Sequence, residues 1–485
     1  MSKNIKSITN PKLRLDILTP EEVKKIHDAT LWIIEKVGVR FPSKNALAVW
    51  EAHGASVDHE KMIVRAKAEL IEQALKTCPP VYPLAARDPQ QDLSLDGNHV
   101  YVGTDGCGVE VIDIQTGQRR TSQLQDVADI ARLADATEEV AFHWVPVSAQ
   151  DTPPETRGLH EIKAIWENST KHVQTESIYN QREARAAIEM AALLAGGKEN
   201  LRQRPMLSLM QCSASPLGHD GGSLDAALLA AEVGLPTGFM TMAACLTTGP
   251  ATMAGNLAVG NAEVIAATAM LQLAHPGAPV FYAAAQTASD PRNGAYTGGG
   301  PEDFLFGAAT NVLADYYNLP LSMGSFATGA KEPNWQAGLE NSLSTFMASL
   351  VMSDMLLGLG FLHGSRIWSF AEMMMDAEIF SIIHKMMQGI VVNDDTLALD
   401  AIAAVGPGGN FLAQKHTRQH MRDLFLPQFM DRRPYNEWES KKDDGRDWAL
   451  SKARKILAEH QPDPLDEKMR AEMDKIIAAE EKEVV

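Results

Sequence analysis

The sequence predicts an α/β protein built as a TIM (β/α)8 barrel, with an N-terminal helical extension and a C-terminal helical segment. A short apolar run is followed by an amphipathic helical pattern eight times between residues 99 and 390. Many of the runs are continuously apolar, which is typical of parallel strands buried on both faces. The 485 residues also leave room for a barrel of about 250 residues and its flanking segments.

The first segment, residues 1–98, is expected to be helical. Helices are predicted over 20–37, where Thr19 can act as the cap, over 43–53, which ends at Gly54, and over 66–76. The third helix stops before Pro79, because a proline disfavours helix in the residue before it. Residues 99–390 are then the barrel domain and residues 391–485 the C-terminal helical segment.

The barrel elements follow in order along the chain. The expected strands are 99–102, 140–147, 171–177, 205–212, 237–242, 279–285, 320–325 and 354–360. The helices that follow them are 122–136, 155–168, 181–195, 222–233, 250–274, 301–317, 335–350 and 371–390. A β-hairpin is expected after the first strand, with its turn at residues 115–117. Neither a G-x-G-x-x-G fingerprint nor a P-loop is present, which weakens nucleotide-binding interpretations.

Composition narrows the class of partner. The net charge of −18 argues against a nucleic-acid surface and could attract a cationic substrate. None of the four cysteines, Cys78, Cys107, Cys212 and Cys245, forms a C-x-x-C pair, and reduced thiols are the default. With no signal-peptide core and no long uncharged apolar stretch, we expect a cytoplasmic protein with no membrane contact.

In a TIM barrel the active site lies at the carboxyl ends of the strands, and this edge is rich in aromatic residues here. The candidate substrate-binding residues are Tyr101, Trp144, Tyr282, Gln286, Tyr296, Phe326, His363, Arg366 and Trp368. The candidate catalytic residues are Glu176 and His363. Aromatic faces attract quaternary ammonium groups, and a His or Arg suits a carboxylate. No H-x-H or H-E-x-x-H spacing indicates a metal centre.

Each candidate also has a purely structural interpretation. Trp144 and Tyr282 could fill the barrel, and Glu176 could pair with a barrel cation. His363 could be a structural histidine. Lys331 lies near the top of the seventh strand and could form a Schiff base, although a solvated turn lysine explains it as well.

Two stretches resemble the trimethylamine methyltransferase family. Residues 291–340 carry a glycine-rich G-x-P-E segment, an Ala-rich helix ending in Y-Y-x-L-P, and a Q-A-G-x-E helix start. Residues 406–440 carry the pattern GPGG-x-FL…HT…H…R…P…DR…Y…W. The spacing of the barrel agrees with the family from about residue 20 to about residue 458.

The resemblance implies a barrel that methylates a cognate corrinoid protein, with cobalamin held by that partner and no cofactor bound tightly by this chain. Founding members act on trimethylamine and carry pyrrolysine, which this sequence lacks. It therefore resembles the branch without pyrrolysine, whose substrates are quaternary amines such as glycine betaine, proline betaine, carnitine and γ-butyrobetaine. Two alternative functions are a Schiff-base aldolase or lyase and a non-catalytic betaine-binding protein. The sequence also allows a homo-oligomer.

The expected chemistry sets requirements for the site. When reduced cobalt takes the methyl group, the amine leaves neutral with its electron pair, so no general acid is needed. The protein has to orient the methyl group and exclude water. A close carboxylate would favour the cationic ground state and cost rate, so we expect aromatic walls around the ammonium group.

Overall fold

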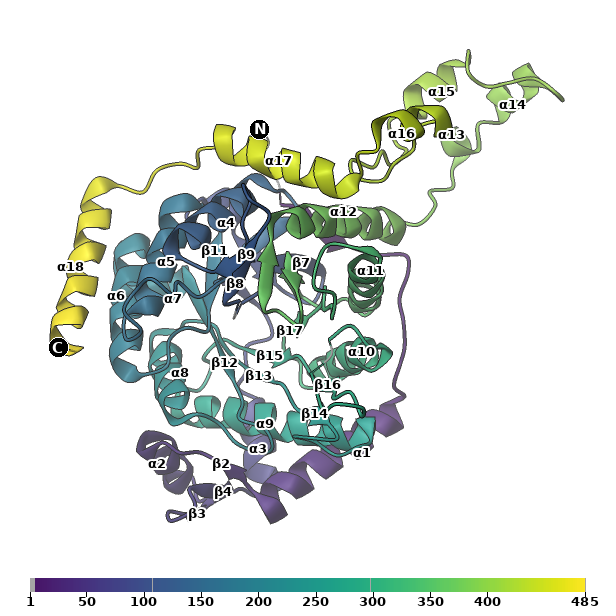
Figure 1. Cartoon of the computed structure of the whole chain (residues 1–485). Coiled ribbons are helices and arrows are strands. Elements are labelled where there is room, and N and C mark those ends of the chain that lie inside the picture. The colour runs from purple at the N-terminus through teal and green to yellow at the C-terminus, as the bar shows by residue number, and fades with distance from the viewer. Residues whose placement is uncertain (1–4, 107, 297, 485) are drawn as a thin grey trace.

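The computed structural model describes residues 5–106, 108–296 and 298–484, so Cys107 lies outside the described residues. Eight parallel strands close into a barrel surrounded by helices (Figure 1). In order, the strands are β7 (His99–Thr104), β10 (Val140–Trp144), β11 (His172–Thr175), β12 (Leu207–Cys212), β13 (Thr237–Thr241), β15 (Val280–Ala284), β17 (Leu321–Gly324) and β18 (Met355–Leu359), which pairs with β7. The predicted TIM barrel is confirmed.

Each barrel strand is followed by the helix that the sequence predicts. These helices are α4 (Leu124–Ala136), α5 (Arg157–Asn168), α6 (Gln181–Ala195), α8 (Gly221–Val233), α9 (Met253–Ala274), α10 (Pro301–Tyr316), α11 (Trp335–Leu350) and α12 (Phe370–Met387). A short helix, α7 (Lys198–Gln203), follows α6. Helix α9 is long and apolar enough to cross a membrane, but 83% of its most apolar window is buried inside the protein. It is a core helix, apolar on all sides because neighbours surround it.

Inward-facing side chains fill the amino-terminal half of the barrel. Phe142, Phe281 and Leu357 form a buried cluster with the hairpin of β5 (Tyr82–Leu84) and β6 (Leu93–Leu95). The hairpin precedes the barrel in sequence, and its three-residue strands are too short to show a periodicity. Because this end is filled, open space inside the barrel is confined to the carboxyl end.

The N-terminal segment contains the three predicted helices. They are α1 (Pro20–Trp32), continued by a π-helical turn (Ile33–Val37), α2 (Lys44–Ala52) and α3 (Ala68–Leu75). Thr19 and Glu22 form a capping box at the start of α1. Short strands, which the sequence did not indicate, lie between the helices: β2 (Val39–Arg40), β3 (Ser56–Asp58) and β4 (Ile63–Arg65) form one sheet. Strand β1 (Ile8–Thr9) pairs antiparallel with β7.

Two small sheets at the carboxyl end of the barrel fix the loops there. The hairpin of β8 (Glu110–Ile112) and β9 (Arg119–Thr121) joins β20 (Ile367–Ser369) and β19 (Phe361–Leu362) in one sheet. Strands β14 (Ala244–Cys245) and β16 (Thr287–Ala288) form the other sheet. The first sheet ties the loop after β7 to the loop after β18, which lie about 260 residues apart in the chain.

The C-terminal segment is helical, as predicted. Helices α13 (Asp394–Leu397), α14 (Leu399–Val405), α15 (Lys415–His420) and α16 (Tyr435–Lys441) project away from the barrel (Figure 1). Helix α17 (Gly445–Glu459) returns along α12, and α18 (Glu467–Val484) lies against α5 and α6.

Candidate functional site

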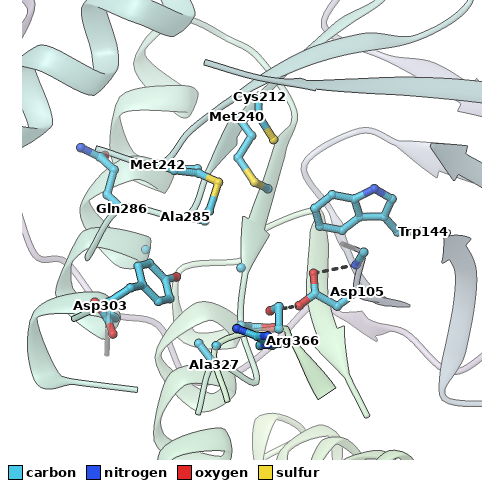
Figure 2. Close-up of a pocket in the computed structure, with 18 of the residues that line it drawn as sticks. Asp105, Trp144, Cys212, Met240, Met242, Ala285, Gln286, Asp303, Ala327 and Arg366 are labelled. Atoms are coloured by element: carbon cyan, nitrogen blue, oxygen red, sulfur yellow. Dashed lines mark hydrogen bonds between the residues drawn. The ribbon is translucent and has the colours of Figure 1, made fainter. Parts of the chain in front are cut away.

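A cavity of about 440 Å³ opens at the carboxyl end of the barrel, above the filled half. Figure 2 shows its lining, which comes from the strand ends and from the loops that follow them. The lining includes Asp105, Gly106, Trp144, Cys212, Met240, Met242, Gln286, Tyr296, Asp303, His363, Ser365 and Arg366.

One part of the cavity wall is aromatic and rich in sulfur. Trp144 ends β10. Cys212 ends β12, Met240 lies on the adjacent strand β13, and Met242 lies in the loop after β13. Thioether and indole groups are polarizable and contact methyl groups favourably. Burial raises the pKa of the Cys212 thiol to about 12, so this side chain is a neutral wall and not a nucleophile.

Gly106 lets the backbone pass close to this wall. A β-carbon at Gly106 would lie 2.6 Å from the Trp144 ring and 2.8 Å from a Glu176 carboxylate oxygen. Any side chain here would therefore displace the indole or the carboxylate. Glu176 is buried and is not among the residues that line the cavity. The structure thus places this candidate catalytic residue next to Gly106 but outside the cavity lining, where it can affect a ligand only through the residues that line the cavity.

Two carboxyl groups, those of Asp105 and Asp303, lie on opposite sides of the cavity (Figure 2). Burial raises the pKa of Asp105 to about 6, although the Ser365 hydroxyl and the Gly106 N–H (2.9 Å) both donate to its carboxylate. Burial also raises the pKa of Asp303 to about 6, although a 2.9 Å hydrogen bond from the Gly300 N–H acts to lower it. A cation between these carboxylates would offset the cost of ionising them.

A positively charged side chain, Arg366, lies at the rim of the cavity. The Arg366 side chain is 59% exposed and lies 3.5 Å from Glu110, so its guanidinium is open to solvent on one side. His363 contributes a buried Nδ1 atom with no hydrogen-bond partner. Burial, together with Lys331 and Arg366, lowers the pKa of His363 below its usual value. His363 is therefore neutral at pH 7 and can offer a hydrogen bond to a ligand.

Five of the predicted substrate-binding residues line this cavity: Trp144, Gln286, Tyr296, His363 and Arg366. The Gln286 amide nitrogen donates to the Asn256 carbonyl (2.8 Å), whereas its buried Oε1 has no hydrogen-bond partner. Tyr296 also lines a second groove of about 820 Å³ along the rim, together with Gly298 and Lys331. The structure thus brings these five side chains to one place, and their contacts with a ligand stay a prediction.

The other four predicted substrate-binding residues do not line the cavity, and these placements are corrections. Tyr282 faces the helix layer, where its hydroxyl donates to Asn261 on α9 (3.1 Å). Tyr101 lies in the filled half of the barrel, stacked on His99. Neither side chain can form a wall of the cavity.

Phe326 and Trp368 belong to the hydrophobic core outside the barrel interior. Trp368 lies on β20 with its ring edge against Phe361, at a centroid distance of 5.2 Å. Phe326 is 1% exposed and has a positive φ of 47°, so it turns the chain after β17. Both positions follow a strand end in sequence, but neither side chain lines the cavity.

Lys331 lies outside the cavity on the rim groove. It is exposed, and its ammonium group donates to the carbonyl of Gly329 in its own turn. A Schiff-base lysine needs a desolvated or charge-perturbed environment, which this position does not provide. The structure therefore gives the aldolase alternative no support.

Sequence reasoning missed the two cavity carboxyls and the methionines. Asp105 follows the first barrel strand, so its position in the chain is a usable signal for a residue of the site. Asp303 is the third residue of α10 and accepts the N–H of the N-cap residue Gly300, which looks like an ordinary helix start in sequence. Met240 and Met242 cannot be distinguished from core residues without knowing which strand face is inward.

One group of metal-ligand type lies elsewhere among the described residues: Asp395, His416 and His420, in the projecting helices. Both His420 ring nitrogens face carboxylates, Asp423 at 2.7 Å and Asp395 at 3.2 Å. The hydrogen bond to Asp423 raises the pKa of His420. This geometry is that of a protonated imidazole between two carboxylates, and it lies apart from the cavity.

The fold and the cavity define a TIM-barrel enzyme with a site for a small organic molecule. The model of the family described as "Trimethylamine methyltransferase (MTTB)" matches residues 1–485, and the chain belongs to this family. It is a methyltransferase, and the expectation from the two motifs is confirmed.

Curated relatives match almost the whole chain. One is a trimethylamine methyltransferase MttB of Desulfitobacterium hafniense (strain DSM 10664 / DCB-2), 34% identical over 96% of this chain and 93% of the relative. A glycine betaine methyltransferase of D. hafniense (strain Y51) is 33% identical over 97% and 98%. The solved Methanosarcina barkeri monomethylamine methyltransferase (MtmB) has the same fold, with a TM-score of 0.50, 10% identity, and coverage of 90% and 92%.

Proposed function

We propose that this enzyme moves a methyl group from a betaine to the cob(I)alamin of a cognate corrinoid protein. The betaine is glycine betaine or a relative such as proline betaine, carnitine or γ-butyrobetaine. The observation that carries the proposal is the cavity itself, which joins an indole, sulfur side chains and two buried carboxyls to a cationic rim. The relative named a glycine betaine methyltransferase supports this substrate class.

The proposed reaction needs positioning more than proton transfer. The electron pair of reduced cobalt would form the Co–C bond, and the two electrons of the broken C–N bond would stay on nitrogen. The product is a neutral tertiary amine, so no side chain has to donate a proton. Trp144 and the sulfur wall would hold the methyl groups in a dry, fixed orientation. Neither Glu176 nor His363 then serves as an acid, and His363 would bind the substrate carboxylate.

The cavity carboxyls change one part of the expected electrostatics. We expected aromatic walls alone around the ammonium group, because a nearby carboxylate favours the cationic ground state. Asp105 and Asp303 both line the cavity, so the binding of the cation is favoured at some cost in rate. The rim groove beside Tyr296 would receive the edge of the corrinoid.

The charge arrangement favours a zwitterion over trimethylamine. A betaine carries a cation at one end and a carboxylate at the other, which fits carboxyls inside the cavity and Arg366 at its rim. With cob(I)alamin and the purified enzyme, glycine betaine or a close relative is expected to give methylcobalamin, measured by absorbance, and trimethylamine is not. Turnover of trimethylamine alone would overturn the substrate assignment, and binding of betaines without any turnover would indicate a binding protein.

The affinity for a betaine is expected to fall as the pH drops below about 6. The pKa values of Asp105 and Asp303 are about 6 in the free protein, and a bound cation favours their ionised forms. Binding therefore lowers both pKa values and releases protons. At pH 5 each carboxyl is mostly protonated, which weakens affinity by about tenfold per carboxyl that the ligand needs ionised. Calorimetry in buffers of different ionisation enthalpy measures this proton release, and a pH-independent affinity would contradict the expectation.

A further inference from the structure

The projecting segment of residues 391–442, here called the arm, buries none of its side chains within the chain. Its helices α13, α14, α15 and α16 are four to seven residues long. Isolated helices of this length are unstable in water, because nucleation costs more than a few hydrogen bonds return. Ordering the backbone also costs about 1–2 kcal/mol per residue. The arm therefore needs a covering surface in order to stay folded.

The exposed surface of the arm is strongly apolar. Leu412 is 86% exposed and Leu426 is 75% exposed, and Leu399, Leu424 and Tyr435 are each more than 60% exposed. Soluble monomers rarely expose apolar patches larger than a few hundred Å² unless another molecule covers them. The arm thus exposes leucine and aromatic side chains that a covering surface would desolvate.

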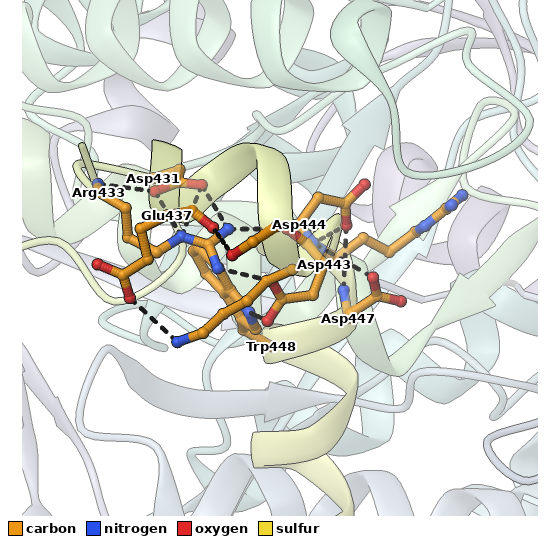
Figure 3. A network of polar contacts seen from close by, with 10 residues as sticks. Asp431, Arg433, Glu437, Asp443, Asp444, Asp447 and Trp448 are labelled. Carbon is orange, nitrogen blue, oxygen red and sulfur yellow. Dashed lines mark hydrogen bonds and ion pairs between the residues drawn. The ribbon is translucent and has the colours of Figure 1, made fainter. Parts of the chain in front are cut away.

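The base of the arm is tied to the start of α17 by a network of polar contacts (Figure 3). The Arg433 guanidinium donates to Asp431 and Asp443 and lies 4.8 Å from the centre of the Trp448 ring. The Trp448 indole N–H in turn donates to Asp443 (2.6 Å). The Glu378 carboxylate on α12 accepts the backbone N–H groups of Gln428 and Phe429. The arm is therefore presented in a defined direction, which reduces the entropy lost on binding.

Charge indicates which molecule covers the arm. The arm carries seven Lys and Arg residues against seven Asp and Glu residues, so it is neutral. The remaining residues carry the whole net charge of −18. Two copies of this chain repel each other over most of their surfaces, and the arm is a region where they can meet without net repulsion.

We propose that the arm is the interface with a second copy of this chain, in a symmetric dimer. A partner that leaves after each methyl transfer would uncover the arm in every cycle, whereas a second copy covers it permanently. A two-fold arrangement also lets the same apolar surface cover its equivalent. The inference does not rest on the identity of the substrate.

Sedimentation of the full chain tests the dimer. We expect a species of twice the 52.8 kDa chain mass at micromolar concentration. The double variant Leu412→Glu/Leu426→Glu is expected to raise the dissociation constant of the dimer at least a hundredfold. Val81→Glu is the control, since Val81 is 54% exposed in the segment just before β5, and it should leave the dimer unchanged.

A second measurement needs no variant. Equal amounts of ¹⁴N- and ¹⁵N-labelled wild-type chains are mixed by dilution below the dissociation constant of the dimer, concentrated again and cross-linked, and cross-links at Lys415 of the arm are expected between the two isotopes. The proposal is overturned if the chain is monomeric, if the double variant dimerises like the wild type, or if every cross-link at Lys415 lies within one copy. An arm that becomes protected from hydrogen exchange only when a corrinoid protein is added would also overturn it.

Discussion

Trp144→Ala is expected to weaken the binding of a betaine by about tenfold to thirtyfold. The indole lines the cavity at the end of β10, and a desolvated cation over an indole face contributes about 2 kcal/mol. The substitution also leaves space for water next to the methyl groups, which lowers kcat because positioning is lost. Calorimetric titration gives the affinity, and single-turnover methylation of cob(I)alamin gives the rate.

Trp144→Phe is the matched control, because it keeps an aromatic face and removes only part of the ring. It should recover most of the affinity that alanine loses. Equal affinity in the wild type and in Trp144→Ala would mean that the ammonium group binds elsewhere. The prediction also requires that the alanine variant unfolds in one cooperative transition like the wild type, which circular dichroism measures.

Asp105→Asn is expected to raise KM by about tenfold to a hundredfold while leaving kcat unchanged or higher. The charge on nitrogen disappears as the C–N bond breaks, so a carboxylate stabilises the ground state more than the transition state. Its loss therefore weakens binding without slowing the chemical step. The amide keeps the shape of the side chain and can still accept the hydrogen bond from the Gly106 N–H.

A second buried carboxyl provides the control for this experiment. Burial also raises the pKa of Asp354 to about 6, but Asp354 lies at the amino-terminal end of β18, where it accepts the Leu321 N–H (3.0 Å). Asp354→Asn should change stability and leave KM unchanged. A fall in kcat with constant KM in Asp105→Asn would contradict the assigned role and would point to an acid or base.

The barrel could be predicted because its signal is repeated along the chain. Each βα unit shows an apolar strand and an amphipathic helix, so an error in one unit does not change the class of fold. The N-terminal sheets and the hairpin at the barrel base could not be predicted, because strands of two or three residues have no measurable period. Their pairing depends on the barrel against which they pack.

The site was harder to predict, because strand ends place side chains on alternating faces. On β15 Phe281 and Ala283 point into the barrel, so Tyr282 between them faces the helices. A shift of one residue exchanges the side chains that face the barrel interior with those that face the helices. Because buried parallel strands are apolar on both faces, the sequence does not show which set faces inward. Trp144 lines the cavity because it shares the inward face of β10 with Phe142.

Contacts between distant loops lie beyond sequence reasoning altogether. Ser365 reaches the Asp105 carboxylate only because the small sheet of β8 and β20 joins the two loops. The spacing of residues along the chain cannot predict this contact, because the contact depends on closure of the barrel between β18 and β7. His363 and Arg366 could be found because they lie in the loop after the last strand, where the fold places functional residues.

The most direct measurement follows the methyl group itself. Glycine betaine and, in separate reactions, its relatives are deuterated in their N-methyl groups and incubated with the enzyme and cob(I)alamin, and the products are analysed by mass spectrometry. We predict one deuterated methyl group on cobalt for each molecule of dimethylglycine formed. Cobalamin without label, with glycine betaine and its relatives recovered intact, would contradict the proposed methyl transfer.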